Sequence, residues 1–228
     1  MTHETDITGV LKADAGSLLV DVRSPNEFVK GHIPGALHIP VFDDEERAQV
    51  GIRYKKAGRS KATDLAMELV RPKQQDLLEQ VQKLAKTGKV TLYCWRGGMR
   101  SAKFAQFLSE NGLEVDLIKG GYKSYRNLIY NSFKLPWKLV VVGGMTGTGK
   151  TDILVELKTR KCQVLDMEGL ANHKGSTFGA LGQANQPSTE QFQNNIWEIW
   201  QHFDITKPIF VEDESQAIGT VRIPDRLF

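Results

Sequence analysis

A cysteine begins a loop that is rich in glycine and arginine. Cys94 follows the apolar residues 90–93 and opens the run Cys-Trp-Arg-Gly-Gly-Met-Arg-Ser. The two glycines allow such a loop to turn several backbone N–H groups toward one point, and Arg96 and Arg100 add positive charge beside the sulfur. Both effects favour the thiolate, which is the reactive form of cysteine. The loop therefore predicts a nucleophilic cysteine, with Cys94, Arg96 and Arg100 as the catalytic residues.

A second anion-binding loop lies further along the chain. Residues 144–151 read Gly-Met-Thr-Gly-Thr-Gly-Lys-Thr, which satisfies the P-loop pattern G-x-x-x-x-G-K-[ST]. The apolar run 138–142 precedes this motif and a helical pattern follows it, which is the context that the motif requires. Backbone amides would cradle a diphosphate, the lysine would reach its terminal oxygens, and the last threonine would bind Mg²⁺. The predicted phosphate-binding residues are Gly144, Gly147, Thr148, Gly149, Lys150 and Thr151.

A P-loop that holds Mg²⁺ needs an acidic partner. The apolar segment 209–211 runs into Glu212 and Asp213, while Asp166 and Glu168 follow the apolar residues 164–165. We take Asp213, together with Thr151, as the candidate metal ligands; each acidic pair is equally compatible with a solvated strand end. The loop predicts phosphate binding without specifying ATP, because any diphosphate ester would satisfy the same amides.

The elements that must position these loops alternate between strands and helices. We expect strands at 17–22, 90–93, 113–118, 138–142, 163–165 and 209–211. We expect helices from Pro25, over 63–86 with a break near Pro72, and over 101–111, 122–132, 152–159 and 191–203. This alternation predicts an α/β fold with mainly parallel sheets. Pro136 is the natural boundary between two domains, residues 1–135 and 136–228.

The composition is that of a globular protein. Of the 228 residues, 40% are hydrophobic and 25% are charged, and the length allows two domains. No apolar run approaches the ~20 residues needed to span a bilayer, and the N-terminus lacks the basic start and apolar core of a signal peptide. Only Cys94 and Cys162 are present, so there is no disulfide framework. We therefore expect a cytoplasmic protein with no membrane partner.

Positive charge is concentrated in one segment. The net charge is only +3, but residues 51–61 contain five basic side chains and no acidic one. They are Arg53, Lys55, Lys56, Arg59 and Lys61. Such a segment is either a nucleic-acid contact or a solvated loop or helix start, and charge alone favours the second interpretation.

Three motifs together resemble the rhodanese-like sulfurtransferases. They are the Cys94 loop, the segment 21–28 (Asp-Val-Arg-Ser-Pro-Asn-Glu-Phe) and the segment 31–36 (Gly-His-Ile-Pro-Gly-Ala), and they cover about residues 5–130. The resemblance implies a persulfide or perselenide on Cys94, stabilised by the amides of residues 95–100. Five residues separate Cys94 from Arg100, whereas many rhodaneses have four. The wider loop suits a phosphate-sized group and keeps a cysteine-dependent phosphatase as an alternative for this module.

The order of the two modules is more specific than either alone. A rhodanese-like domain followed directly by a P-loop domain resembles the tRNA 2-selenouridine synthase family. Further resembling segments are 120–126, 165–171 and 211–215. The resemblance implies replacement of sulfur by selenium in 2-thiouridine at the wobble position of tRNA. It implies selenophosphate and geranyl diphosphate as substrates, S-geranyl-2-thiouridine as an intermediate, and a selenophosphate-producing enzyme as a partner. Lys123 and Arg126 would join the basic segment in meeting tRNA phosphates.

Two alternatives remain at this point. The chain could be a rhodanese-type persulfide carrier fused to an NTP-hydrolysing P-loop module, or an inactive tRNA-binding fragment. The second alternative arises because the family's members are longer than this chain. We expect an incomplete P-loop domain, with three strand candidates where such domains usually have five.

Overall fold

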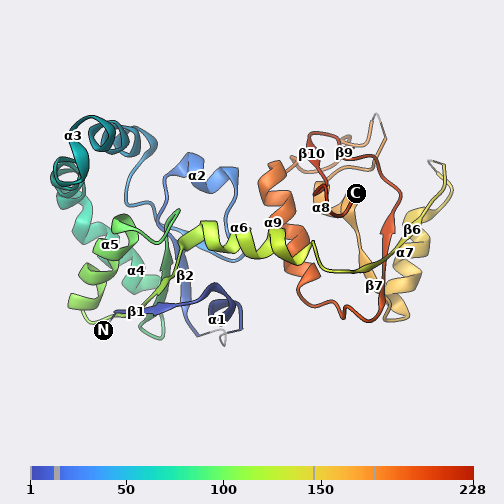
Figure 1. The fold of residues 1–228 in the computed structure, drawn as a ribbon, viewed down its shortest axis with the longest axis horizontal. Helices are drawn as coiled ribbons and strands as arrows, with labels where there is room; N and C mark the ends of the chain where they lie inside the picture. The colour runs from blue at the N-terminus through green and yellow to red at the C-terminus, as the bar shows by residue number, and fades with distance from the viewer. Residues whose placement is uncertain (1, 13–15, 146, 177) are drawn as a thin grey trace. The chain divides into compact units, whose positions relative to one another are not determined.

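The chain folds into two compact units, Met1–Arg126 and Asn127–Phe228. The computed structural model describes residues 2–12, 16–145, 147–176 and 178–228. Each unit is described separately below, and Figure 1 labels the elements of both. The two units have the α/β class predicted from the sequence. Within the described residues, no helix has the length and apolar character needed to cross a membrane.

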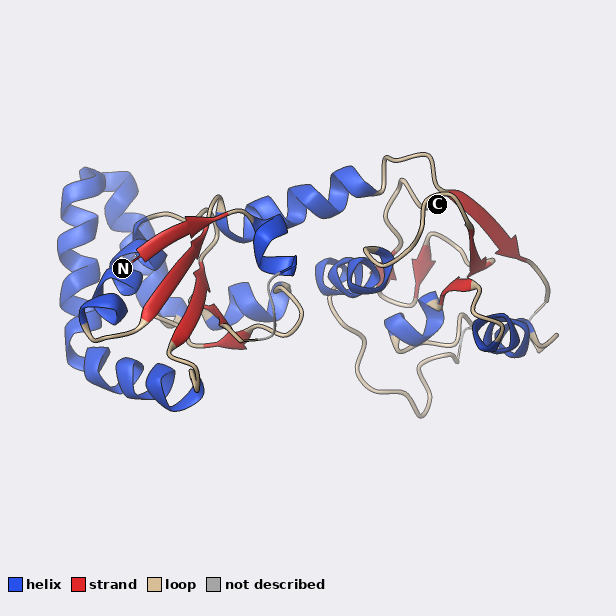
Figure 2. Ribbon diagram, turned by 90° about the horizontal axis from the view of Figure 1, so that it is seen from below, coloured by secondary structure: helices blue, strands red, loops and turns tan. Residues whose placement is uncertain are grey.

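The first unit is built on a five-stranded parallel sheet in the order β1-β5-β4-β2-β3. The strands, in that order, are Thr2–Thr5, Glu114–Ile118, Lys89–Tyr93, Leu18–Asp21 and Leu37–His38. The central strand β4 pairs with β2 on one side and with β5 on the other. The edge strand β1 was not predicted, because its residues are polar and mostly exposed. Figure 2 shows the sheet lying among the helices of this unit.

Side chains that alternate along the strands form the core on one face of this sheet. Val20, Leu92 and Leu117 are buried there. They pack with residues of α4 (Gln74–Leu84) and α5 (Met99–Glu110) in one cluster. The remaining helices of the unit are α1 (Ile7–Lys12), α2 (Pro25–Lys30), α3 (Asp44–Val70) and the 3₁₀ turn η1 (Arg71–Lys73), with α6 (Gly121–Ser132) at its end. This core holds the strand that carries Cys94.

Local signals explain several helix ends. Ser24 precedes α2, and its backbone N–H donates to Glu27 at 3.1 Å as part of a capping box. The predicted break near Pro72 is confirmed, since η1 separates α3 from α4. Helix α3 begins earlier than predicted, because Asp43 caps it by accepting from the backbone N–H of Glu46 at 2.8 Å. The basic segment therefore belongs to a helix, which is kinked at Gly58 (φ +80°).

The second unit has a smaller parallel sheet in the order β6-β8-β7. These strands are Lys138–Val142, Pro208–Glu212 and Gln163–Leu165, as predicted to within one or two residues. Helices α7 (Lys150–Thr159), α8 (Met167–Ala171) and α9 (Thr189–Trp200) accompany them, and β9 (Ala217–Ile218) pairs with β10 (Val221–Arg222) in a short antiparallel ribbon. Among the described residues, β6 has no strand on its outer edge, and Val141 is 57% exposed. Trp200 fills the core against Trp137 and Phe133.

Candidate functional site

Cys94 lies directly after β4, where the strand ends and the loop to α5 begins. Its side chain is only 4% exposed. The loop reverses at Gly97, whose φ of +64° is a conformation that favours glycine. Gly98 then precedes α5, which begins at Met99. The N-terminus of α5 therefore lies beside the sulfur, where the positive end of the helix dipole stabilises an anion.

The beginning of α6 holds this loop in place. The backbone N–H of Tyr122 donates to the carbonyl of Cys94, and that of Lys123 donates to the carbonyl of Trp95, both at 2.9 Å. The two segments can approach this closely because Gly121 has no side chain. A Cβ on Gly121 would lie 2.3 Å from the Cys94 carbonyl oxygen and 2.5 Å from the Gly97 nitrogen. The Gly-Gly pair at the start of α6 is thus part of the cysteine site.

We expect Gly121→Ala to destabilise the first unit by about 2–4 kcal/mol, because it combines a left-handed backbone with a steric clash. The matched control is Gly98→Ala, since nothing lies within 4 Å of a Cβ at Gly98 and its φ is −89°. Urea denaturation of both variants tests this difference. Equal stability of the two variants would contradict the close packing described for Gly121.

The groups around Cys94 favour ionisation of its thiol. Burial acts to raise its pKa, but several groups that favour the thiolate outweigh burial and hold the pKa below its usual value. These groups are the Ser101 hydroxyl, the charge of Arg100 and the backbone N–H groups of Ser101 and Arg96. The Ser101 hydroxyl donates to Sγ at 3.1 Å. Sequence reasoning missed Ser101 as a partner of the thiol, although its place in the first turn after the loop was a signal for it.

Removing the Ser101 hydroxyl is expected to raise the pKa of Cys94. In Ser101→Ala the thiolate loses its side-chain donor while burial stays the same, so a smaller fraction is ionised at neutral pH. The rate of alkylation by iodoacetamide, measured from pH 5 to pH 9, should give a profile shifted to higher pH. Ser109→Ala, at the far end of the same helix, serves as the control with an unchanged profile. A Ser101→Ala profile that coincides with wild type would show that this hydroxyl does not stabilise the thiolate.

The two loop arginines have different positions. Arg96 is exposed in the loop, whereas Arg100 is largely buried and forms an ion pair with Glu27 of α2. The nitrogens of Arg100 donate to the Glu27 carboxylate at 2.6 and 3.3 Å. Although burial acts to raise the pKa of Glu27, the hydrogen bond from Arg100 and the other cationic and backbone partners lower it overall. Arg100 therefore acts on the sulfur by its charge while Glu27 fixes its position.

A buried ion pair between Asp21 and Arg23 lies next to the elements that hold the cysteine loop. Arg23 binds the carboxylate of Asp21 with a shortest distance of 2.6 Å, and both side chains are inaccessible to solvent. The guanidinium lies over the ring of Tyr122 at 3.9 Å and also donates to the carbonyl of Gly31. Both residues of this pair belong to the rhodanese-like segment 21–28. The ion pair connects the strand β2 with the start of α6, which positions the cysteine loop.

The P-loop of the second unit connects β6 to α7. Gly149 has a φ of +83° and directly precedes Lys150, the first residue of α7. The ammonium group of Lys150 donates to the carbonyl of Gly144 at 2.8 Å, so it folds back over the loop. Thr148 donates its hydroxyl to the carbonyl of Met145 at 2.8 Å. Thr146 of the motif lies outside the described residues.

A cavity of about 570 Å³ opens beside this loop. Gly147, Gly149, Lys150 and Thr151 line it, and so do a histidine and four carboxylates: His173, Asp152, Asp166, Glu168 and Glu214. Burial, and next the neighbouring Glu168, raise the pKa of Glu214 to about 7. The structure thus brings Glu214 to the cavity, a residue that the sequence analysis did not select. The cavity is suitable for a diphosphate because of its volume, the ammonium group of Lys150 and the N-terminus of α7 beside it.

The other acidic residues after β8 differ in position. Glu212 is buried and accepts from the backbone N–H of Met167 at 3.1 Å, and burial raises its pKa to about 7. Asp213 is exposed beside the start of the P-loop, since a Cβ on Gly143 would lie 3.5 Å from its carboxylate. Among the described residues, no three His, Cys, Asp or Glu side chains could hold a metal by themselves. Mg²⁺ is commonly held by one or two carboxylates together with substrate phosphates, and the residues around Thr151 fit that mode.

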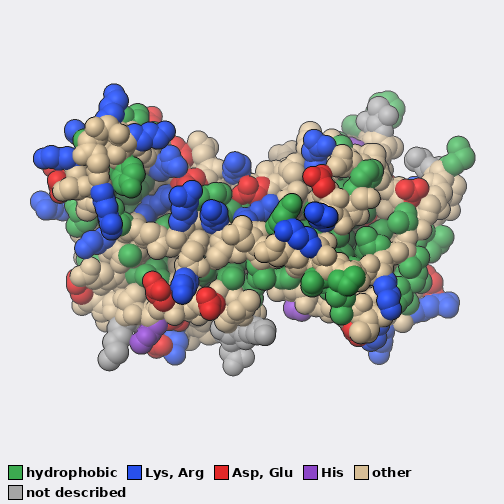
Figure 3. Space-filling view, in the orientation of Figure 1, with side chains coloured by type: hydrophobic (Ala, Val, Ile, Leu, Met, Phe, Trp, Pro, Cys, Tyr) green, Lys and Arg blue, Asp and Glu red, His purple; other side chains and the backbone are tan. Residues whose placement is uncertain are grey.

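The basic segment forms a solvent-exposed surface on α3. All five of its Lys and Arg side chains are exposed, as are the neighbouring Ile52 and Tyr54. Figure 3 shows Lys and Arg side chains gathered over the part of the molecule where Figure 1 labels α3. Lys123 on α6 is exposed as well, while Arg126 is partly buried. The exposure of these side chains is compatible with the predicted contact with an RNA backbone, which stays a proposal.

The comparisons with known proteins match this arrangement. The profile of the rhodanese-like domain matches residues 10–128, and that of the "tRNA 2-selenouridine synthase AAA domain" matches residues 137–228. The chain is 39% identical to the tRNA 2-selenouridine synthase of Nitrosomonas europaea, over 98% of this chain and 59% of that protein. It is 40% identical to the one from Bdellovibrio bacteriovorus, over 92% of this chain and 57% of that protein.

A solved structure resembles the first unit. It is the N-terminal domain of a putative ATP/GTP binding protein from Clostridium difficile, with a TM-score of 0.53 and 36% identity, and the match covers 55% of this chain and 97% of that domain. The chain spans about three fifths of the length of the curated relatives that it matches. The chain therefore belongs to the rhodanese-like domain family by residues 10–128, and over nearly its whole length it is similar to proteins named tRNA 2-selenouridine synthase.

Proposed function

We propose that this chain carries the selenium-exchange and prenyl-transfer sites of a tRNA 2-selenouridine synthase. The observation that supports this most is the combination of a thiolate-stabilising Cys94 loop with a P-loop cavity in one chain similar to proteins of that name. The substrate is tRNA with 2-thiouridine at the wobble position, and the selenium donor is selenophosphate from a selenophosphate-producing enzyme. A reducing compartment, the cytoplasm, keeps the Cys94 thiol available.

The P-loop cavity is the site proposed for geranyl diphosphate. The loop amides and Lys150 bind the diphosphate, and Mg²⁺ on Thr151 with a carboxylate would neutralise its charge. In the transfer step the C–O bond of the donor breaks, a C–S bond to the thiouridine sulfur forms, and diphosphate leaves. Alkylation converts the sulfur into a thiolate leaving group. It therefore prepares carbon 2 of the base for exchange.

Cys94 is the residue proposed to carry or deliver selenium. The loop amides and the start of α5 stabilise an anionic chalcogen at the end of the cysteine side chain. In the exchange, the selenium of selenophosphate forms a C–Se bond to carbon 2, the C–S bond breaks, and the sulfur leaves as geranyl thiolate. Water then hydrolyses the Se–P bond and releases inorganic phosphate. Arg96, which is exposed at the mouth of the loop, is placed to attract the phosphate group of the donor.

The decisive experiment incubates the protein with 2-thiouridine tRNA, geranyl diphosphate and selenophosphate, and then identifies nucleosides by mass spectrometry. Formation of S-geranyl-2-thiouridine and 2-selenouridine supports the proposal. ATP hydrolysis with unchanged nucleosides would instead favour a persulfide carrier fused to an NTP-hydrolysing module. Binding of tRNA without formation of either modified nucleoside would favour the alternative that the chain is an inactive tRNA-binding fragment.

The basic surface of α3 is proposed to bind tRNA phosphates. The triple variant Arg53→Gln, Lys55→Gln, Lys56→Gln should bind tRNA about tenfold more weakly, and its log affinity should fall less steeply with log salt, by about 0.9 per lost contact. The control neutralises Lys83, Lys86 and Lys89, which are exposed elsewhere in the same unit. Filter binding at several salt concentrations measures both sets. Similar losses in the two sets would indicate a general charge effect rather than a binding surface.

A further inference from the structure

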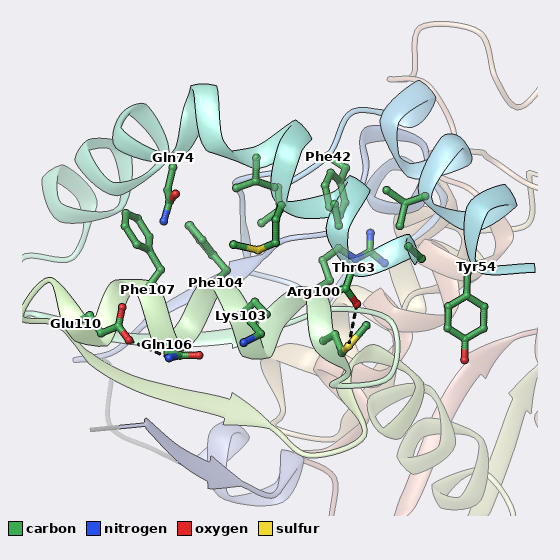
Figure 4. A pocket seen from close by; sticks show the side chains of 17 residues that line it. Phe42, Tyr54, Thr63, Gln74, Arg100, Lys103, Phe104, Gln106, Phe107 and Glu110 are labelled. Atoms are coloured by element: carbon green, nitrogen blue, oxygen red, sulfur yellow. Dashed lines mark hydrogen bonds between the residues drawn. The ribbon is translucent and has the colours of Figure 1, made fainter. Parts of the chain in front are cut away.

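An apolar groove of about 300 Å³ lies in the first unit between α3 and α5. Its inner wall is aliphatic and aromatic, and Figure 4 shows Phe104 and Phe107 rising into it from one side and Phe42 facing them from the other. The lining also includes Val41, Val50, Ala62, Ala66, Met67 and Val70. Met67 is 44% exposed and Tyr54 is 55% exposed, so the groove is open to solvent. An exposed apolar groove commonly marks a binding site.

The groove begins where the cysteine site ends. Met99 and Arg100, the first residues of α5, line the groove, and the next residue, Ser101, donates its hydroxyl to the Cys94 sulfur. Phe104, one turn further along α5, packs in the same core cluster as Cys94. A substrate whose reacting atom approaches the Cys94 loop can therefore place an attached group along α5 in the groove.

Two of the polar side chains that line the groove already have hydrogen-bond partners within the chain. Gln106 donates to Glu110 at 2.9 Å, and the Thr63 hydroxyl donates to the carbonyl of Arg59 at 2.9 Å. Among the described residues, no buried side-chain nitrogen or oxygen of the groove lacks a hydrogen-bond partner. The aliphatic and aromatic side chains of the inner wall offer a nucleobase edge no donor or acceptor, so burying the base against them would be costly. A hydrocarbon chain has no such requirement.

Charge at the rim indicates what the hydrocarbon is attached to. Lys103 lines the groove and is exposed, and the exposed Arg59 on α3 reaches the sulfur of Met99 at 3.2 Å. The remaining basic residues of the α3 surface lie on the same helix, before and after Arg59. An apolar channel with cations at its edge suits an aliphatic chain on an anionic carrier, and RNA is such a carrier.

We propose that this groove binds the aliphatic chain of an S-alkylated thionucleoside and so presents its carbon 2 to the Cys94 site. The proposal rests on the proposed function, because prenyl transfer supplies the alkylated nucleoside. It adds a specificity: the first unit selects 2-thiouridine that has already been prenylated. The order of the two reactions would then follow from binding rather than from a separate control.

Methionine methyl groups report on both sites. The chain has five methionines, of which Met67 and Met99 line the groove and Met145 lines the P-loop cavity. With ¹³C-methyl-methionine protein, addition of S-geranyl-2-thiouridine should shift the Met67 and Met99 signals. Unmodified 2-thiouridine should leave them unchanged, and inorganic diphosphate should shift Met145 alone. Shifts of Met67 and Met99 by neither nucleoside, or equally by both, would overturn the proposal.

A variant pair tests the groove itself. Met67→Glu places a charge in the apolar wall and should weaken binding of S-geranyl-2-thiouridine at least about tenfold, with Met99 as the remaining reporter. The control is Leu84→Glu, because Leu84 is 43% exposed, lies on α4 and does not line the groove. Equal affinities in the two variants would contradict the assignment. Groove signals that move with protein concentration alone would show that a second copy covers it, which would also overturn the proposal.

This test is independent of the proposed function. If the groove signals respond to the prenylated nucleoside but the tRNA assay yields no product, the selenium chemistry is wrong and the groove assignment stands. If the assay yields 2-selenouridine while the groove signals stay unchanged, the function stands and the groove assignment fails.

Discussion

Cys94→Ala is expected to abolish formation of 2-selenouridine while S-geranyl-2-thiouridine still accumulates. The variant removes the atom that the loop amides, Ser101 and Arg100 stabilise, so exchange should fall on the order of a thousandfold or more. Prenyl transfer depends on the diphosphate site, which belongs to the other compact unit. Mass analysis of nucleosides from tRNA treated with wild type and variant measures both products.

Cys162→Ala is the matched control for this experiment. Cys162 is the only other cysteine of the sequence, and it lies partly buried between α7 and β7, in the second unit. Its replacement should leave both products at wild-type levels. Loss of geranylation in a folded Cys94→Ala protein would show that the two reactions are not divided between the two sites. If Cys94→Ala still formed 2-selenouridine, Cys94 would not be required for selenium exchange.

Lys150→Ala is expected to lower prenyl transfer about a hundred- to a thousandfold, the usual cost of losing one group that stabilises charge in a transition state. The ammonium group lies over the P-loop and lines the cavity with Thr151. Diphosphate carries the charge that builds up as the C–O bond breaks, and the backbone amides alone cannot replace a cation. The rate of S-geranyl-2-thiouridine formation at saturating tRNA measures the effect.

Selenation of tRNA that was geranylated beforehand separates the roles of the two sites. On such tRNA, Lys150→Ala should form 2-selenouridine at the wild-type rate, because the diphosphate site has no further part. Lys158→Ala, also on α7 but exposed and outside the cavity, is the control and should keep both activities. If Lys150→Ala transferred the prenyl group normally, the P-loop would have to bind another phosphate compound.

Features carried by consecutive residues could be predicted from the sequence. The capping box of Ser24 and Glu27, the helix break near Pro72 and the P-loop between β6 and α7 all depend on short spacings along the chain. The strands around Cys94 were predictable because each is a short run of mainly apolar residues flanked by residues typical of turns. The edge strand β1 escaped prediction because its polar residues carry no such pattern and pair with β5, far away in sequence.

The order of the modules and the candidate reactive groups were thus readable from the sequence, because backbone geometry and residue chemistry decide them locally. Tertiary structure alone decided the partners of those groups. It pairs Arg100 with Glu27 across 73 residues, brings Glu214 rather than the predicted Asp213 into the lining of the P-loop cavity, and places α3 against α5 to form an apolar groove. These contacts depend on how separate elements pack, and the spacing of residues along the chain carries no record of that packing.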